Sequence, residues 1–293
     1  MSQKQANLIL ATVSLAWGLS YVFMKLGIDG MQPATIVALR CGIAFLVTML
    51  IFGKKMMKIS IQLLKYAAIS GALLAGIFAM LLYGVLNTSA TSAGFLTSTT
   101  VVMVPMIQAC LYRKLPGPNI MIGVVIVFLG LILMTVRDQL TLDIGAIFCL
   151  IAALLYAIHI LVSNHFVRRV DALQLGIYQL GFAALYAVIY ALIFETPVLP
   201  NSPSHWFAIL GLALICSAYG FVMQSVAQKY TTAESVGFLF SLEPIFSAIF
   251  AFLFLHEVIG VNSYFGAILI MVGVFIANSS KHKLKKHYTE QVS

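Results

Sequence analysis

One stretch of the chain places an acidic side chain inside an apolar segment. The sequence GFLFSLEPIFSAIFAFLFL, residues 237–255, contains Glu243, followed at once by Pro244. A carboxylate in such a segment can bind a proton or hold a cationic group, and the proline removes a backbone hydrogen bond at the same point. A segment that carries both groups needs surroundings that are neither bulk water nor bare lipid.

The composition indicates that the chain lies in a membrane, where neighbouring helices can shield such a segment from lipid. Hydrophobic residues make up 61% of the 293 residues, charged residues make up 9%, and the mean hydropathy is +1.03. Such a chain lacks the polar surface that a soluble core of this size needs, so we predict an all-α integral membrane protein. A helix that crosses the roughly 30 Å hydrocarbon layer needs about 20 apolar residues. Ten runs are predicted to cross: 7–26, 33–52, 65–86, 91–112, 118–136, 143–163, 172–194, 205–227, 233–255 and 262–279.

The net charge of +8 is explained by where Lys and Arg lie relative to the predicted spans, so nucleic-acid binding is not needed to account for it. With a cytoplasmic N-terminus, the outward segments hold only Lys25 and Arg137, and the inward segments hold nearly all other cations. We therefore predict that both termini are cytoplasmic and that the tail KHKLKK lies near anionic lipid headgroups. The inward cations are Lys4, Lys54, Lys55, Lys58, Lys65, Arg113, Lys114, Arg168, Arg169, Lys229, Lys281, Lys283, Lys285 and Lys286.

The chain also contains an internal repeat. A constant shift along the chain places GFLTSTTVVM (94–103) on GFLFSLEPIF (237–246). A slightly smaller shift relates the earlier helices, with Trp17 on Tyr156, Ser20 on His159 and Arg40 on Gln179. Five helices are an odd number, so the second copy crosses the membrane in the opposite sense. This predicts two inverted-topology five-helix repeats, at 1–138 and 139–280, before a basic cytoplasmic tail at 281–293.

Several motifs together resemble one transporter family. The stretches LAWGLSYVFMK, ALRCG, SLEPIFSAIFAFLFLHE and GAILIMVGV are similar in order and spacing to the EamA type of the drug/metabolite transporter (DMT) superfamily. The resemblance implies a ten-helix transporter of small organic metabolites, commonly an exporter in a bacterial inner membrane, with a central cavity lined by both halves. It leaves the substrate open, because the superfamily covers amino acids, nucleobases, sugars, quaternary amines and drugs.

Glu243 is the leading candidate for a functional side chain. It lies about twelve residues, or roughly 18 Å, from the outer end of its segment, where an acid costs on the order of 3 kcal/mol. We hypothesise that it lines the cavity and binds a proton or a cationic group of the substrate, since low dielectric favours the protonated form. The alternative is a neutral acid bonded to neighbouring helices, with Pro244 only a kink. Its repeat counterpart, Thr100, is also polar.

Other cavity candidates follow from helical spacing. Tyr156, His159 and Ser163 share one face, and Trp17, Ser20 and Met24 share the matching face of the first helix. The two aromatics can form facing walls and His159 can relay protons, although helix packing explains all three equally simply. Tyr83 and Tyr219 are further candidates.

Three residues are assigned structural or hinge roles. Pro105 and Pro244 interrupt helical hydrogen bonding. Arg40 lies too deep for an interfacial anchor, so we expect it to bond backbone carbonyls or a neighbouring polar group, and to pair with Glu243 only if their helices adjoin.

The scarcity of buried cations narrows the substrate. Anionic metabolites need several deep Lys or Arg, and only Arg40 qualifies, so a zwitterionic, neutral or cationic solute fits better. Aromatic amino acids lead, with quaternary amines, cationic drugs or nucleobases as the alternative. We find no metal cluster, nucleophile–base pair or phosphate loop, which disfavours a lipid-modifying enzyme; no cofactor is expected. The expected partners are a small-molecule substrate and the bilayer, with protons as a candidate coupling ion and a monomer or homodimer left open.

Overall fold

The computed structural model describes the chain except for residues 58, 114–116, 136–143, 259 and 291–293. In the last helix, side chains are described only as far as Ile276. Lys58, Lys114, Arg137 and the side chains of the predicted basic tail at 281–293 therefore lie outside the described residues.

The chain is helical and contains no strand in its described parts. Of the membrane-length helical segments in the described residues, five are single α-helices: α1 (Gln3–Ile28), α2 (Pro33–Met56), α3 (Ile61–Asn87), α7 (Ile144–Phe166) and α8 (Ala172–Phe194). Within the part of the chain that the structure describes, eight helical segments in all are long and apolar enough to cross a membrane. Two shorter apolar stretches, Pro118–Gly130 and Tyr264–Ile276, lie in the fifth and tenth predicted spans. The prediction of an all-helical integral membrane protein is confirmed.

Short polar side chains cap the N-termini of several helices. Ser2, Ser60, Ser89, Asp171, Ser202 and Thr232 each accept a hydrogen bond from a backbone N–H in the first turn. Such caps satisfy N–H groups that have no partner inside a helix. They also explain why α1 and α3 begin before the predicted apolar runs: a capped first turn does not need to be apolar.

Two predicted spans are each broken into two helices. Residues 91–112 form α4 (Ala90–Thr97) and α5 (Thr100–Tyr112), and residues 233–255 form α11 (Ala233–Phe240) and α12 (Glu243–Leu255). The breaks lie at equivalent positions of the internal repeat. Pro244 occupies the first turn of α12, where its missing N–H costs no helical bond. Pro105 instead lies inside α5.

The eighth predicted span contains an unusual helix. It consists of α9 (Pro203–Leu210), the π-helix η1 (Gly211–Tyr219) and α10 (Gly220–Gln228). The caps Ser202 and Thr232 bracket this span, as Ser60 and Ser89 bracket its repeat counterpart, α3. The residue numbers show that the first pair of caps is one position further apart than the second pair. A π-helical turn accommodates one extra residue in this way.

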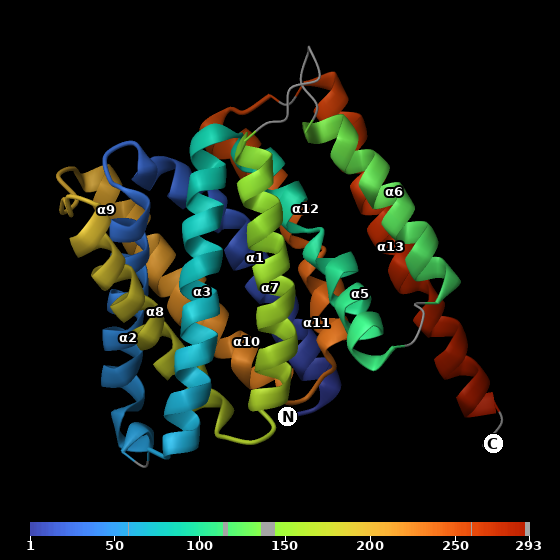
Figure 1. Ribbon diagram of the computed structural model, residues 1–293, viewed down its shortest axis with the longest axis horizontal. Coiled ribbons are helices and arrows are strands. Elements are labelled where there is room, and N and C mark those ends of the chain that lie inside the picture. The colour runs from blue at the N-terminus through green and yellow to red at the C-terminus, as the bar shows by residue number, and fades with distance from the viewer. Residues whose placement is uncertain (58, 114–116, 136–143, 259, 291–293) are drawn as a thin grey trace.

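The helices form a bundle with one pair of helices at its side (Figure 1). Helix α1 is central and packs against α4, η1, α10, α11 and α12. Helices α6 (Pro118–Thr135) and α13 (Val261–Glu290) pack mainly against each other, and glycines join them closely. A Cβ at Gly130 would lie 2.7 Å from the Gly266 carbonyl oxygen, and one at Gly273 would lie 2.7 Å from that of Gly123.

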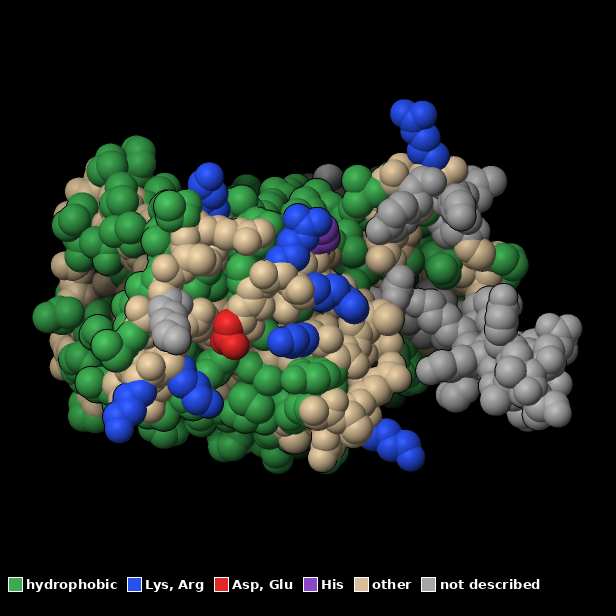
Figure 2. All heavy atoms as spheres, turned by 90° about the horizontal axis from the view of Figure 1, so that it is seen from below, with side chains coloured by type: hydrophobic (Ala, Val, Ile, Leu, Met, Phe, Trp, Pro, Cys, Tyr) green, Lys and Arg blue, Asp and Glu red, His purple; other side chains and the backbone are tan. Residues whose placement is uncertain are grey.

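Basic side chains gather at one end of the bundle. Figure 2 shows this face crowded with Lys and Arg and nearly free of acids. It is the end where α1 and α3 begin and α2 and α7 finish (Figure 1). We call it the basic end, defined by Lys4, Lys54, Lys55, Lys65, Arg168 and Arg169.

Candidate functional site

A small buried cavity lies at the centre of the bundle. Its volume is about 30 Å³, roughly the space of one water molecule. Both halves of the chain contribute side chains to it, most of them from α1 to α4 and the others from the later helices. They are Trp17, Ser20, Arg40, Ile77, Phe78, Leu81 and Thr97, and then Tyr156, Phe221 and Glu243.

Glu243 lines this cavity from the first residue of α12. Its side chain is 8% exposed, and Oε1 accepts a 2.8 Å hydrogen bond from the Tyr21 hydroxyl of α1. The break before α12 directs the helix N-terminus toward this point, and helix N-termini favour negative charge. Oε2 has no hydrogen-bond partner among the described residues, so it is available to a solute.

Arg40 lines the same cavity from α2 and is 1% exposed. Its Nε donates a 2.9 Å hydrogen bond to the Ser217 hydroxyl of η1, and its guanidinium lies 3.9 Å from the centre of the Phe78 ring. Within the described part of the chain, its Nη atoms have no hydrogen-bond partner, and no ion pair joins Arg40 to Glu243. One positive and one negative group thus face one cavity while keeping free polar atoms.

Aromatic rings form another part of the cavity wall. Trp17 meets Tyr156 edge to face at 5.7 Å between ring centroids, and it contacts Phe221 and Phe240 at 4.7 Å each. Trp17 and Tyr156, which were predicted to form facing walls of the cavity, therefore contact each other directly in this conformation. The Tyr156 hydroxyl is buried and has no hydrogen-bond partner among the described residues. Such a group lowers stability unless another conformation supplies a partner.

The π-helix holds one side of the site. The indole N–H of Trp17 donates a 2.8 Å hydrogen bond to the Cys216 carbonyl, and the next residue, Ser217, holds Arg40. A wide π turn leaves carbonyls without helical partners, and π-helices are frequent at functional sites. Two of the cavity's polar side chains thus depend on the segment that carries the extra residue.

Ser20 and His159 are less directly placed for binding a solute. Ser20 lines the cavity, but its hydroxyl donates to the Trp17 carbonyl at 2.7 Å. His159 lies beside Tyr156 and Phe221, outside the cavity wall, and it bonds Gln179 and Ser163.

Thr100 is the first residue of α5, as Glu243 is of α12, but its environment differs. It is 2% exposed and donates a 3.0 Å hydrogen bond to the Ala153 carbonyl of α7. The two equivalent positions therefore carry different tasks: one hydroxyl ties two helices together, whereas one carboxylate faces the cavity.

The two remaining tyrosines lie elsewhere. Tyr219 is 39% exposed and bonds Thr12 at 2.6 Å. Tyr83 lines a separate pocket of about 270 Å³ between α2, α3 and α8.

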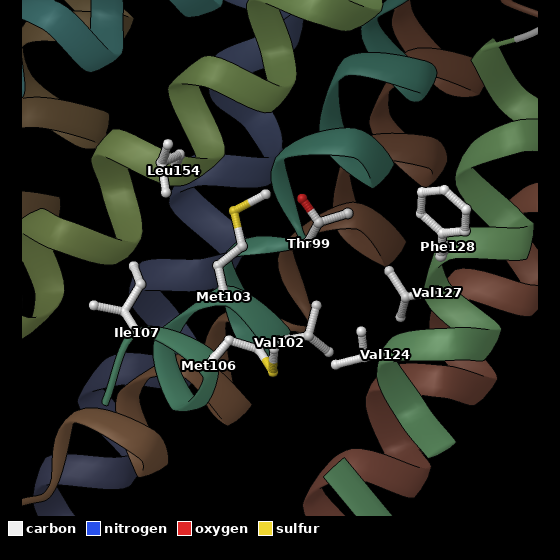
Figure 3. A pocket seen from close by; sticks show the side chains of 9 residues that line it. All are labelled: Thr99, Val102, Met103, Met106, Ile107, Val124, Val127, Phe128 and Leu154. Carbon is white, nitrogen blue, oxygen red and sulfur yellow. The ribbon is translucent and has the colours of Figure 1, made fainter. Parts of the chain in front are cut away.

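A roomier apolar pocket lies away from the site. Its volume is about 280 Å³. It lies between α5, α6 and α7 and is lined by apolar side chains and one hydroxyl, that of Thr99 (Figure 3). It offers no charged partner to a solute.

Sequence reasoning missed several residues of the site. Tyr21 lies one helical turn after Trp17, so its spacing could have placed it on the same face. Thr97, Phe78 and Phe221 carry no such signal, because apolar and hydroxyl side chains are common throughout the spans. Ser217 depends on the π-helix, which no spacing predicts.

Comparisons with known proteins identify the family. A profile of the EamA-like transporter family matches residues 4–136 and again residues 143–279. An uncharacterized transporter of Archaeoglobus fulgidus is 28% identical over 278 residues, which cover 93% of this chain and 85% of the relative. The uncharacterized transporter YoaV of Bacillus subtilis is 26% identical over 277 residues, covering 91% and 94%.

A solved crystal structure shares the fold, with a TM-score of 0.73, 16% identity, and coverage of 97% of this chain and 99% of the other. The family match covers nearly the whole chain, and the matched relatives are transporters. Together they indicate a transporter and not an enzyme. The chain belongs to the EamA-like transporter family of the DMT superfamily and is a multi-pass membrane transporter.

Proposed function

We propose that the protein is a secondary active transporter of small zwitterionic solutes, with aromatic amino acids as the leading substrates. The observation that carries this proposal is the presence of Glu243 and Arg40 on one buried cavity with aromatic walls. A zwitterion brings an ammonium group for the carboxylate and a carboxylate for the guanidinium. An aromatic side chain is then matched by Trp17 and Phe221.

Arg40 also separates this proposal from its closest rival. A quaternary amine would gain from Glu243 and the aromatic rings, but it would meet the guanidinium with no negative group to offer. A nucleobase would meet both charged groups without a charge of its own. Aromatic amino acids satisfy both ends of the cavity.

Transport is proposed to proceed by alternating access between two inverted repeats, residues 1–138 and 139–280. The equivalent breaks in α4/α5 and α11/α12 and the two matches to the family profile support this division. The cavity lies where the halves meet, and its small volume agrees with a closed state that must expand to bind a solute.

The basic end is proposed to face the cytoplasm of a bacterial inner membrane, with both termini and the tail at 281–293 on that side. Its Lys and Arg side chains support this through the positive-inside rule (Figure 2). Export is the proposed direction, in line with the family resemblance.

Counterflow in proteoliposomes tests the substrate class. Vesicles preloaded with unlabelled L-tryptophan should accumulate labelled L-tryptophan, and external L-phenylalanine should compete whereas choline and adenine should not. Inhibition by choline with no effect of L-phenylalanine would transfer the assignment to quaternary amines. Absence of any counterflow would contradict the amino-acid proposal.

Glu243 is proposed to couple transport to protons or to hold the substrate ammonium. Glu243→Gln keeps the size of the side chain and removes its charge, so uptake should fall roughly a hundredfold if an ion pair is lost. Thr100→Val at the equivalent position is the matched control and should retain most activity. An unchanged rate and pH dependence in Glu243→Gln would exclude both roles.

A further inference from the structure

A second buried polar cluster lies between the central cavity and the basic end. It is formed by α7, α8 and α10, and each of its side chains is at most 1% exposed. On α10, Phe221, Gln224 and Gln228 follow helical spacing, so this face continues from the cavity toward the basic end. We call it the polar column, made of His159, Ser163, Gln179, Gln224, Ser225 and Gln228.

Part of the column is hydrogen-bonded. His159 Nε2 bonds Gln179 Oε1 at 3.1 Å, and Gln179 Nε2 donates to the Ser225 hydroxyl at 3.2 Å. The Ser163 hydroxyl lies 3.3 Å from His159 Nε2. These bonds tie α7, α8 and α10 together.

The remaining side-chain polar atoms of the column have no hydrogen-bond partner among the residues that the structure describes. Both ends of the Gln224 amide, both ends of the Gln228 amide and His159 Nδ1 are buried without a hydrogen bond. Buried polar groups are nearly always paired, because each orphan loses its hydration and gains nothing. A purely structural core would place apolar side chains here.

The column lies next to a space at each of its two ends. Phe221 and Tyr156 line the central cavity and lie 6.2 and 6.3 Å from the His159 ring. At the other end, Asn164 donates to the Gln228 carbonyl at 3.3 Å and lines a pocket of about 370 Å³ near the basic end.

The repeat shows that the fold does not require this polarity. When the two halves are aligned on the caps Ser89 and Thr232, the counterparts of the column's α10 side chains lie on α3. Leu81, Leu82 and Val85 then stand where the second half has Gln224, Ser225 and Gln228. All three counterparts are buried and apolar.

We infer that the polar column is one half of the transport path, closed in this conformation, and that it opens from the cavity to the basic end. When α10 moves away from the helices that pack against it, α1, α7 and α8, water and the charged ends of a zwitterion satisfy the unpaired amides. The column carries neutral amide, imidazole and hydroxyl groups. These groups form hydrogen bonds with a passing solute but do not hold it by charge. This inference rests on the proposed transport function.

Cysteine accessibility tests the inference directly. In full-length protein with Cys41, Cys110, Cys149 and Cys216 replaced by alanine and reconstituted in nanodiscs, Gln224→Cys and Gln228→Cys should react with a small charged methanethiosulfonate at least tenfold faster than Val222→Cys and Ala227→Cys. The controls lie on the same helix and are also buried. Added L-tryptophan should change the two fast rates. Equally slow reaction at all four positions would overturn the inference.

A second variant guards against misfolding of the cysteine proteins. Gln224→Leu with Gln228→Leu removes the orphan amides, so the melting temperature should stay or rise while L-tryptophan counterflow falls at least tenfold. Full counterflow with a raised melting temperature would show that the unpaired amides only lower stability and have no role in transport. That result would contradict the inference. Fast labelling without L-tryptophan counterflow in the parent protein would instead contradict only the proposed substrate.

Discussion

The two ends of the bundle are closed by different chemistry on related backbones. Toward the basic end, α10 presents Gln224 and Gln228, whose amides are unpaired. Toward the opposite end, the equivalent positions of α3 present Leu81 and Val85, which pack into the core. As inferred above, α10 is a surface that separates from its neighbours, whereas the related α3 is a seal, and the side chains at equivalent positions differ accordingly.

Two glutamates that bind helix N-termini, which we call the carboxylate caps, show a second difference between the two ends of the bundle. At the opposite end, Glu257 follows α12 and accepts hydrogen bonds from the Ala90 and Thr91 backbone N–H groups at 2.9 and 3.1 Å. Glu195 follows α8 and binds the N-terminus of α2 through Ala34 and Thr35 in the same way. At the basic end, α8 meets α2 through neutral groups, such as the Tyr178 hydroxyl and the Met56 carbonyl.

Among the changes that test this comparison between the two halves, the largest effect is expected from removing the extra residue of the second half. Deletion of Leu214, an exposed residue of η1, should convert the π-helix to an α-helix and turn Cys216 and Ser217 away from Trp17 and Arg40. Counterflow should fall roughly tenfold or more. Deletion of Asn201 in the preceding loop is the control, and similar activity in both proteins would show that the π-helix is dispensable.

A swap of polarity should break the seal. Leu82→Ser copies Ser225 into the first half at a position that is fully buried. It should lower the free energy of unfolding by about 3 kcal/mol, because it leaves a cavity and a buried hydroxyl. Leu86→Ser on the same helix is 45% exposed and should cost under about 1 kcal/mol. Thermal unfolding in detergent measures both, and equal shifts would argue against a packed seal.

The carboxylate caps should contribute less. Glu257→Gln and Glu195→Gln each lose charge-assisted bonds to a helix N-terminus, so each should cost about 2 kcal/mol in thermal unfolding. Asp171→Asn, which alters an exposed cap at the basic end, should cost about 0.5 kcal/mol or less. If all three variants unfold alike, the two ends do not differ in this respect.

The smallest effect concerns a single hydroxyl at the site. Tyr21→Phe removes the bond to Glu243 and should reduce counterflow a few-fold, with a loss of about 1 kcal/mol in stability. Tyr178→Phe loses a comparable bond to the Met56 carbonyl but lies away from the cavity, so it should keep full transport. Equal transport in the two variants would show that the Tyr21 hydroxyl does not contribute to the role of Glu243 in transport.

Much of the fold could be predicted from the sequence, and less of the site. The spans follow from local hydropathy, and the internal repeat relates Thr100 to Glu243, which both begin a second half-helix. The break before Thr100 could not be predicted, because no proline lies there and the chain turns at Ser98 and Thr99. Tyr21 and Ser217 escaped because their roles depend on which helices meet.

By itself, the sequence determined that the chain lies in a membrane, that its two halves are related, and that Glu243 is too costly to face lipid. The first and the last follow from the free energy of transferring a segment or a side chain into hydrocarbon, which depends on local composition. Only the tertiary structure decided that Arg40 and Glu243 face one cavity, that Trp17 is held by a π-helix, and that Gln224 and Gln228 are buried without partners. Those relations arise from packing between distant helices, which no local pattern records.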